Sequence, residues 1–168
     1  MKQAQIAQVS DVDQASPVFQ SGYELLTTPS LNKGTAFTEQ ERLELDLHGL
    51  LPSHISMLDE QIERRLIALR NLPNDLERYV FLRDLQDTIE TLFYGLLVSN
   101  IEEMLPIVYT PTVGPGSQQF SRLFRRPRGY FLSVPLQDQI KRILSHSRFD
   151  DAEVIVATDG ERVLGLGD

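Results

Sequence analysis

Residues 74–100 read NDLERYVFLRDLQDTIETLFYGLLVSN and carry the longest periodic pattern of the chain. Apolar side chains recur there every three or four positions, which is the period of one face of an α-helix. The side chains expected on this face are Leu82, Leu85, Ile89, Leu92, Phe93 and Leu96. The pattern predicts a helix of several turns and makes helix the main element of the fold.

Two further helices are predicted before this stretch. The first begins at a capping box, because Thr38 is followed three residues later by Glu41. The second begins at a similar cap signature at residues 56–59 and ends before Pro73, since the residue that precedes a proline disfavours helix.

The chain after residue 100 is punctuated by proline and glycine. It predicts a short helix at residues 101–105 that Pro106 stops, extended chain at 107–109, a tight loop at 110–114 and a helix at 117–125. The helical region therefore continues to about residue 129.

The pattern changes beyond that point. Residues 130–134 and 154–157 are typical of strands, and residues 136–145 are typical of a helix. A right-handed crossover with parallel strands is the usual solution for this order. The fold class expected is a predominantly α N-terminal helical domain followed by the start of an α/β domain.

Three parts are therefore predicted: a flexible N-terminal arm at residues 1–21, a helical domain at 22–129 and the beginning of an α/β domain at 130–168. A single strand, helix, strand unit cannot cover both faces of its own sheet. We expect a fragment of a larger α/β enzyme, or assembly with another chain.

Composition restricts the class of protein. The net charge is −8, there is no Cys, and neither a secretory signal nor a run of about 18 apolar residues occurs. We expect a cytoplasmic protein without nucleic-acid or membrane partners. His48, His54 and His146 have no metal-ligand spacing, so no metal site is predicted from them.

The chain is acidic overall, but it contains one local patch of basic residues. It consists of Arg122, Arg125, Arg126 and Arg128, with no acid among them. The patch is compatible with an anion or nucleic-acid contact, or with a helix end whose arginines pair with acids elsewhere. In so acidic a chain the second interpretation is preferred.

Tyr109 opens the loop YTPTVG at residues 109–114. Its ring either packs in the core with its hydroxyl bonded to the backbone, or is presented as a general acid. The residues alone favour the core interpretation.

Asp159 and Gly160 indicate a turn, and Arg162 follows at the end of a predicted strand. Its planar fork suits a carboxylate ligand at that position. Gly165 and Gly167 form a lone G-x-G, which is a weak dinucleotide signal.

The ordered set of motifs resembles malic enzymes. The motifs are LNKGTAFT at 31–38, GLLP at 49–52, TLFY at 91–94, YTPTVG at 109–114, RRPRG at 125–129 and TDGERVLGLGD at 158–168. The resemblance departs at Pro115 and Gly116, where many members carry a small residue and a Cys.

The resemblance implies oxidative decarboxylation of (S)-malate to pyruvate and carbon dioxide, with NAD or NADP and Mg²⁺ or Mn²⁺. The bacterial NAD-linked type is expected. Tyr109 matches the general acid that protonates the enol, and Arg162 matches the arginine that binds the substrate carboxylate near the nicotinamide. Members are dimers or tetramers, so a homo-oligomer is expected.

The family's general-base lysine, its three acidic metal ligands and its Rossmann domain follow the position that matches Asp168. No metal ligand is therefore expected within this chain, and the chain alone is expected to be inactive. The alternative is a non-catalytic helical module for oligomerisation or interaction.

Overall fold

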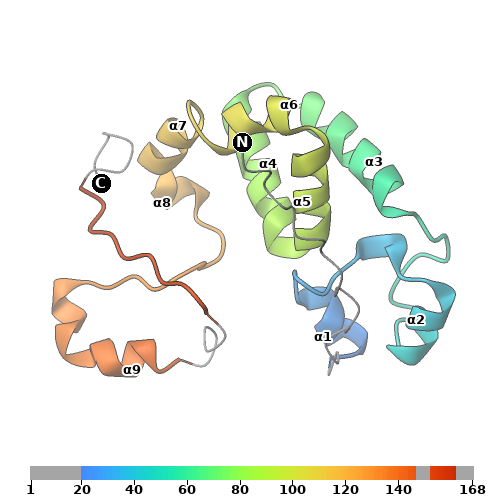
Figure 1. The fold of residues 1–168 in the computed structure, drawn as a ribbon, viewed down its shortest axis with the longest axis horizontal. Coiled ribbons are helices and arrows are strands. Elements are labelled where there is room, and N and C mark those ends of the chain that lie inside the picture. The colour runs from blue at the N-terminus through green and yellow to red at the C-terminus, as the bar shows by residue number, and fades with distance from the viewer. Residues whose placement is uncertain (1–19, 147–151, 162–168) are drawn as a thin grey trace, which may run out of the picture.

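The computed structural model describes residues 20–146 and 152–161. Figure 1 shows these residues as a chain of helices joined by short connections. In order they are α1 (Gly22–Thr27), the 3₁₀ turn η1 (Gly34–Ala36), α2 (Glu39–Glu44), α3 (Leu58–Arg70), α4 (Asp75–Thr88), α5 (Glu90–Ser99), α6 (Ile101–Val108), α7 (Val113–Gln118), α8 (Phe120–Leu123), the 3₁₀ turn η2 (Val134–Gln139) and α9 (Ile140–Leu144). The predominantly helical N-terminal region is confirmed.

The main core lies between α3, α4, α5 and α6. Its most deeply buried side chains are Leu69, Leu82, Leu92, Leu96 and Met104, each at most 1% exposed. Four of these five come from the predicted periodic stretch or the helix before it, because their spacing places them on the faces that meet. A second, smaller core beneath α1 and α2 is formed by Leu25, Phe37 and Leu47.

The predicted helix over residues 74–100 is two helices, α4 and α5. Ile89 has φ −140° and ψ 85°, so the helical path breaks there. The amide of Glu90 donates to the carbonyl of Pro29 at 2.9 Å, and the Asn32 side chain donates to the Thr88 carbonyl at 3.3 Å. The N-terminal segment thus supplies the hydrogen bonds that the helix gives up at the break.

The capping box is confirmed, since Thr38 accepts from the Glu41 amide and the Glu41 side chain accepts from the Thr38 amide.

The predicted stop at Pro106 is wrong, because α6 continues through it to Val108. The prediction of extended chain at 107–109 is wrong for the same reason. Proline removes one backbone donor, and the next turn is held by the amide of Tyr109 on the Leu105 carbonyl at 2.9 Å.

The strands predicted at residues 130–134 and 154–157 are not formed. Within the part of the chain that the structure describes, neither segment has strand structure, and η2 begins at Val134. Both segments are exposed, and an isolated strand without a paired neighbour is not stable. The helical middle of the predicted unit does appear, as η2 and α9.

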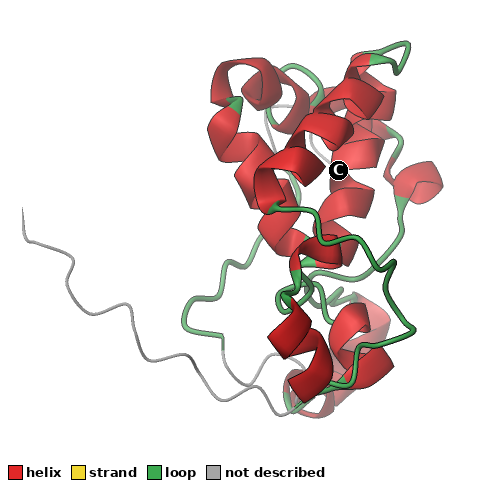
Figure 2. Ribbon diagram, turned by 90° about the vertical axis from the view of Figure 1, so that its right-hand side faces the viewer, coloured by secondary structure: helices red, strands yellow, loops and turns green. Residues whose placement is uncertain are grey.

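Figure 2 shows the helices of the described part without any strand between them. Across residues 20–146 and 152–161, no single helix is long and apolar enough to cross a membrane. Glu90–Ser99 and Ile101–Gln118 reach that length only together, and they meet at a bend of 118°. The domain boundaries at residues 21 and 129 stay predictions.

Candidate functional site

Tyr109 lies directly after α6, at the point where the chain turns into α7. Its amide is held by the Leu105 carbonyl, and its own carbonyl accepts from the Val113 amide at 2.8 Å. The backbone of Tyr109 is therefore fixed between two helices. The Thr110–Pro111 peptide that follows is cis.

The side chain of Tyr109 is presented to solvent. It is 53% exposed, and its hydroxyl makes no hydrogen bond with any residue that the structure describes. The interpretation as a core tyrosine with a satisfied hydroxyl is therefore wrong. What the fold offers is an anchored backbone with a free phenol, a group that can donate or accept a proton.

The loop around Tyr109 is held by its neighbours. Thr112 is buried, and its amide donates to the Pro106 carbonyl at 3.3 Å. Gly116, one of the two positions that depart from the motif, lies under the ring of Tyr79, where an added Cβ would come within 3.1 Å. A glycine at this position lets α7 approach α4 closely.

Arg162 lies outside the described residues, as do Gly165 and Gly167. The turn just before Arg162 is described. Gly160 has φ +79°, and the Asp159 carboxylate accepts from the Glu161 amide at 3.2 Å. The turn predicted at Asp159 and Gly160 is confirmed.

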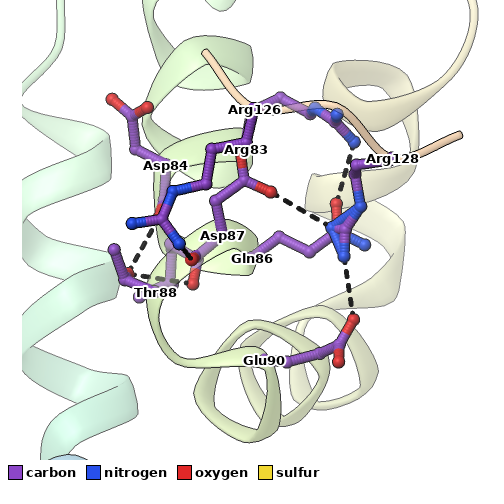
Figure 3. A network of polar contacts seen from close by, with 9 residues as sticks. Arg83, Asp84, Gln86, Asp87, Thr88, Glu90, Arg126 and Arg128 are labelled. Carbon is purple, nitrogen blue, oxygen red and sulfur yellow. Dashed lines mark hydrogen bonds and ion pairs between the residues drawn. The ribbon is translucent and has the colours of Figure 1, made fainter. Parts of the chain in front are cut away.

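Three of the four arginines of the basic patch contact acidic residues or backbone of the helical core, as preferred from the sequence. Arg128 pairs with Asp87 at 3.2 Å and with Glu90 at 2.9 Å, and Arg126 donates to the Asp87 carbonyl at 3.1 Å. Figure 3 shows both arginines reaching from the segment after α8 to the junction of α4 and α5. Arg125 makes a looser pair with Asp84 at 3.6 Å.

Arg42 is a structural residue that the sequence did not reveal. It is only 3% exposed, and its guanidinium donates to the carbonyls of Phe37, Pro52, Thr35 and His54 at 2.6 to 3.4 Å. Helical arginines are usually exposed, so its position in the pattern carried no signal of burial.

Within the described residues, acidic and histidine side chains do not gather into a cluster that could act in catalysis or bind a metal ion. Burial raises the pKa of Glu41, but the hydrogen bonds from Lys33 and Thr38 outweigh it and hold that pKa below its usual value. The hydrogen bond from Arg70 lowers the pKa of Glu103. Among residues 20–146 and 152–161, no three His, Asp or Glu side chains come together where a metal ion could bind.

Comparison with known proteins gives the family. The family described as "Malic enzyme, N-terminal domain" matches residues 86–168. An NAD-dependent malic enzyme of Aeromonas hydrophila is 48% identical over 160 residues, which cover 94% of this chain and 28% of that protein. One of Shewanella frigidimarina is 51% identical over 148 residues, covering 88% and 26%.

The chain therefore belongs to the malic enzyme family and corresponds to the N-terminal region of its members. Within that family it is similar to bacterial proteins named NAD-dependent malic enzyme. It spans about a quarter of the length of these relatives, 26 to 28%.

Proposed function

We propose that this chain is the N-terminal portion of an NAD-dependent malic enzyme, whose complete polypeptide converts (S)-malate to pyruvate and carbon dioxide. The observation that carries the proposal is the identity of 48 to 51% to NAD-dependent malic enzymes over most of the chain. The alternative of a purely structural helical module has no observation of comparable weight.

Tyr109 is the proposed proton donor. Decarboxylation of the oxidised substrate leaves an enolate, and the phenol of Tyr109 donates a proton to its C3 as the enolate C–O bond becomes the carbonyl of pyruvate. The anchored backbone and the exposed, unbonded hydroxyl of Tyr109 support this role. Arg162 is proposed to bind the substrate carboxylate through its planar fork.

NAD would accept the hydride, and Mg²⁺ or Mn²⁺ would stabilise the enolate oxygen. The described residues do not fit a metal site, because no group of acidic or histidine side chains is gathered there. In this proposal the metal ligands, the base and the nucleotide domain come from sequence that aligns beyond Asp168.

The proposal is tested in a chimera. Residues 1–168 replace the matching region of the Aeromonas hydrophila relative, and malate-dependent NADH formation is followed with Mn²⁺ present. We expect an active chimera and an inactive isolated chain. An inactive but folded chimera, or clear turnover by the isolated chain, would contradict the proposal.

The role of Tyr109 is tested in the same chimera. Tyr109→Phe removes the donated proton, so kcat should fall by a factor of about 10² to 10⁴ with little change in KM. Tyr23→Phe is the matched control, because Tyr23 is a 72% exposed tyrosine on α1. Equal kcat values for the two variants would remove Tyr109 from the mechanism.

We also propose a homo-oligomer, supported by exposed apolar side chains on α5 and α6. Tyr94 and Val98 lie one helical turn apart on α5, as do Ile101 and Leu105 on α6, and all four are 47 to 74% exposed. Val98→Lys should lower the mass measured by light scattering, whereas Ser99→Lys should not. Identical masses would argue against this surface.

A cytoplasmic location and the absence of nucleic-acid or membrane partners stay predictions.

A further inference from the structure

The loop that carries Tyr109 is bonded to the helices on both of its sides. The amide of Tyr109 donates to the Leu105 carbonyl of α6 at 2.9 Å. On the other side, the Val113 amide donates to the Tyr109 carbonyl at 2.8 Å. The next bond in the same direction joins the Gly116 amide to the Thr112 carbonyl at 3.1 Å. A displacement of α7 is therefore transmitted to the backbone of Tyr109.

The position of α7 is set by its contact with α4 at Gly116. Gly116 is buried, and an added Cβ would come within 3.1 Å of Cε1 and 3.3 Å of Cζ of the Tyr79 ring. The Tyr79 ring is itself packed against the main core, so it has little room to move aside. Even one methyl group at position 116 should therefore push α7 away from α4.

The phenol of Tyr109 depends on this backbone for its position. Its side chain is 53% exposed, and its hydroxyl makes no hydrogen bond with any residue that the structure describes. The hydroxyl is therefore placed by the backbone and not by a hydrogen-bond partner. Proton transfer needs donor and acceptor within hydrogen-bond reach, and a misplacement of about 1 Å can cost about 10²-fold in rate.

We propose that the contact between Tyr79 and Gly116 positions Tyr109 for proton transfer. Tyr79 is a positioning residue, because it acts through α7 and the loop at 109–114. The inference rests on the proposed function, since it requires Tyr109 to be the proton donor. Position 116 is one of the two at which the chain departs from the family motif, so the motif alone does not predict this contact.

The test follows the protonation step by itself in the chimera with the Aeromonas hydrophila relative. Pyruvate is incubated in D₂O with NADH and Mg²⁺, and NMR measures the loss of its C3 proton signal above the uncatalysed rate. A C3–H bond breaks, and its proton passes to the Tyr109 phenolate while an enolate forms. The phenol exchanges that proton with the solvent, and a deuteron returns from Tyr109 to the same carbon. Varying the pyruvate concentration gives kcat and KM for the exchange.

Gly116→Ala should lower the kcat of exchange at least about fivefold and change KM by less than about twofold, because the proton donor moves while the substrate contacts remain. Gly95→Ala is the matched control. Gly95 lies within α5, and an added Cβ would come within 2.9 Å of Ile62 Cδ1, which belongs to α3 and not to α7. This variant is equally overpacked and should keep kcat within about twofold of the parent chimera.

Variants of Tyr79 test the same contact from the other side. Tyr79→Phe keeps the ring carbons that face Gly116 and should keep kcat, whereas Tyr79→Leu removes the ring and should lower kcat at least about threefold. The double variant Y79L/G116A gives the added methyl group room and should exchange faster than either single variant. A merely structural loss would not be restored in this way. Circular dichroism confirms folding, and Tyr79→Leu alone carries the test if Gly116→Ala does not fold.

The outcomes separate this inference from the proposed function. A folded chimera without exchange, or equal exchange in Tyr109→Phe and the parent, would overturn both. Slow exchange in Tyr109→Phe together with parental kcat in Gly116→Ala, or with equal losses in Gly116→Ala and Gly95→Ala, would overturn only the positioning role. The same holds if Y79L/G116A is no faster than the single variants.

Discussion

The segments that connect the helices of this protein are held in place by a few individual residues. Arg42 holds together the turn at η1 and the segment that leads to α3, because its guanidinium donates to carbonyls of both. Burying a charged group costs free energy unless the group is hydrogen-bonded, so the loss of these bonds should be destabilising.

Arg42→Lys should therefore destabilise the chain by about 2 to 3 kcal/mol, since an ammonium cannot reproduce the planar fork. The free energy of unfolding in urea measures the effect. Arg122→Lys should cost less than about 0.5 kcal/mol, because that side chain is exposed and unpaired. Equal costs at the two sites would show that the four carbonyl contacts contribute nothing.

Gly34 is a second residue whose identity the fold requires. It has φ +60°, and an added Cβ would collide with the side-chain oxygen of Gln61. Gly34→Ala should cost about 2 to 4 kcal/mol through strain and overpacking. Gly49→Ala separates the two causes, because Gly49 has φ +81° but open space around it, and should cost only about 1 kcal/mol.

At the scale of elements, ion pairs at helix ends make the stability depend on acid pH. The folded-state pKa values of Glu41 and Glu103 lie below their usual values. Each group therefore contributes stability above the unfolded-state pKa of about 4.3, and that stability is lost as pH falls through the lower folded-state pKa. Glu103 is 40% exposed, so solvent screening reduces its share.

The double variant E41Q/E103Q should show a shallower loss of stability between about pH 5 and pH 2 than the parent chain. Urea unfolding at several pH values measures this slope. Glu63→Gln is the control, because Glu63 is exposed and makes no described hydrogen bond or ion pair. An unchanged slope in the double variant would contradict the assignment.

The elements also show where local pattern is a sufficient guide. The capping box at Thr38 and the apolar face of α4 and α5 were predictable, because both depend on residues within a turn or two of each other. The break at Ile89 was not, because the bond from the Glu90 amide to the Pro29 carbonyl joins distant parts of the chain.

At the scale of the whole molecule, two arginines join the segment after α8 to the α4–α5 junction. Figure 1 shows α9 and residues 152–161 to the left of the α4–α5 pair and α2 to its right. Arg126 and Arg128 fasten the segment after α8 to Asp87, whose side chain is only 8% exposed. Arg128 bonds the Asp87 carboxylate, whereas Arg126 bonds the Asp87 backbone carbonyl, so the charge of Asp87 should order this part through Arg128.

Asp87→Asn keeps the shape of the side chain but removes its charge, and should cost about 1 to 3 kcal/mol. Hydrogen exchange of the amides in α8 should quicken in this variant. Asp84→Asn is the control, because the Asp84 to Arg125 pair is longer and exposed, and should cost less than about 0.5 kcal/mol. Unchanged protection of α8 in Asp87→Asn would show that the ion pair between Arg128 and Asp87 is not needed.

The sequence by itself determined the family and the helical class of the N-terminal region, and it favoured the pairing interpretation of the arginine patch. These follow from ordered motifs, apolar period and charge, which are properties of the residues themselves. Only the tertiary structure decided the break at Ile89, the burial of Arg42 and the exposure of Tyr109. Each of these depends on which distant backbone groups and side chains meet, and a local pattern does not contain that information.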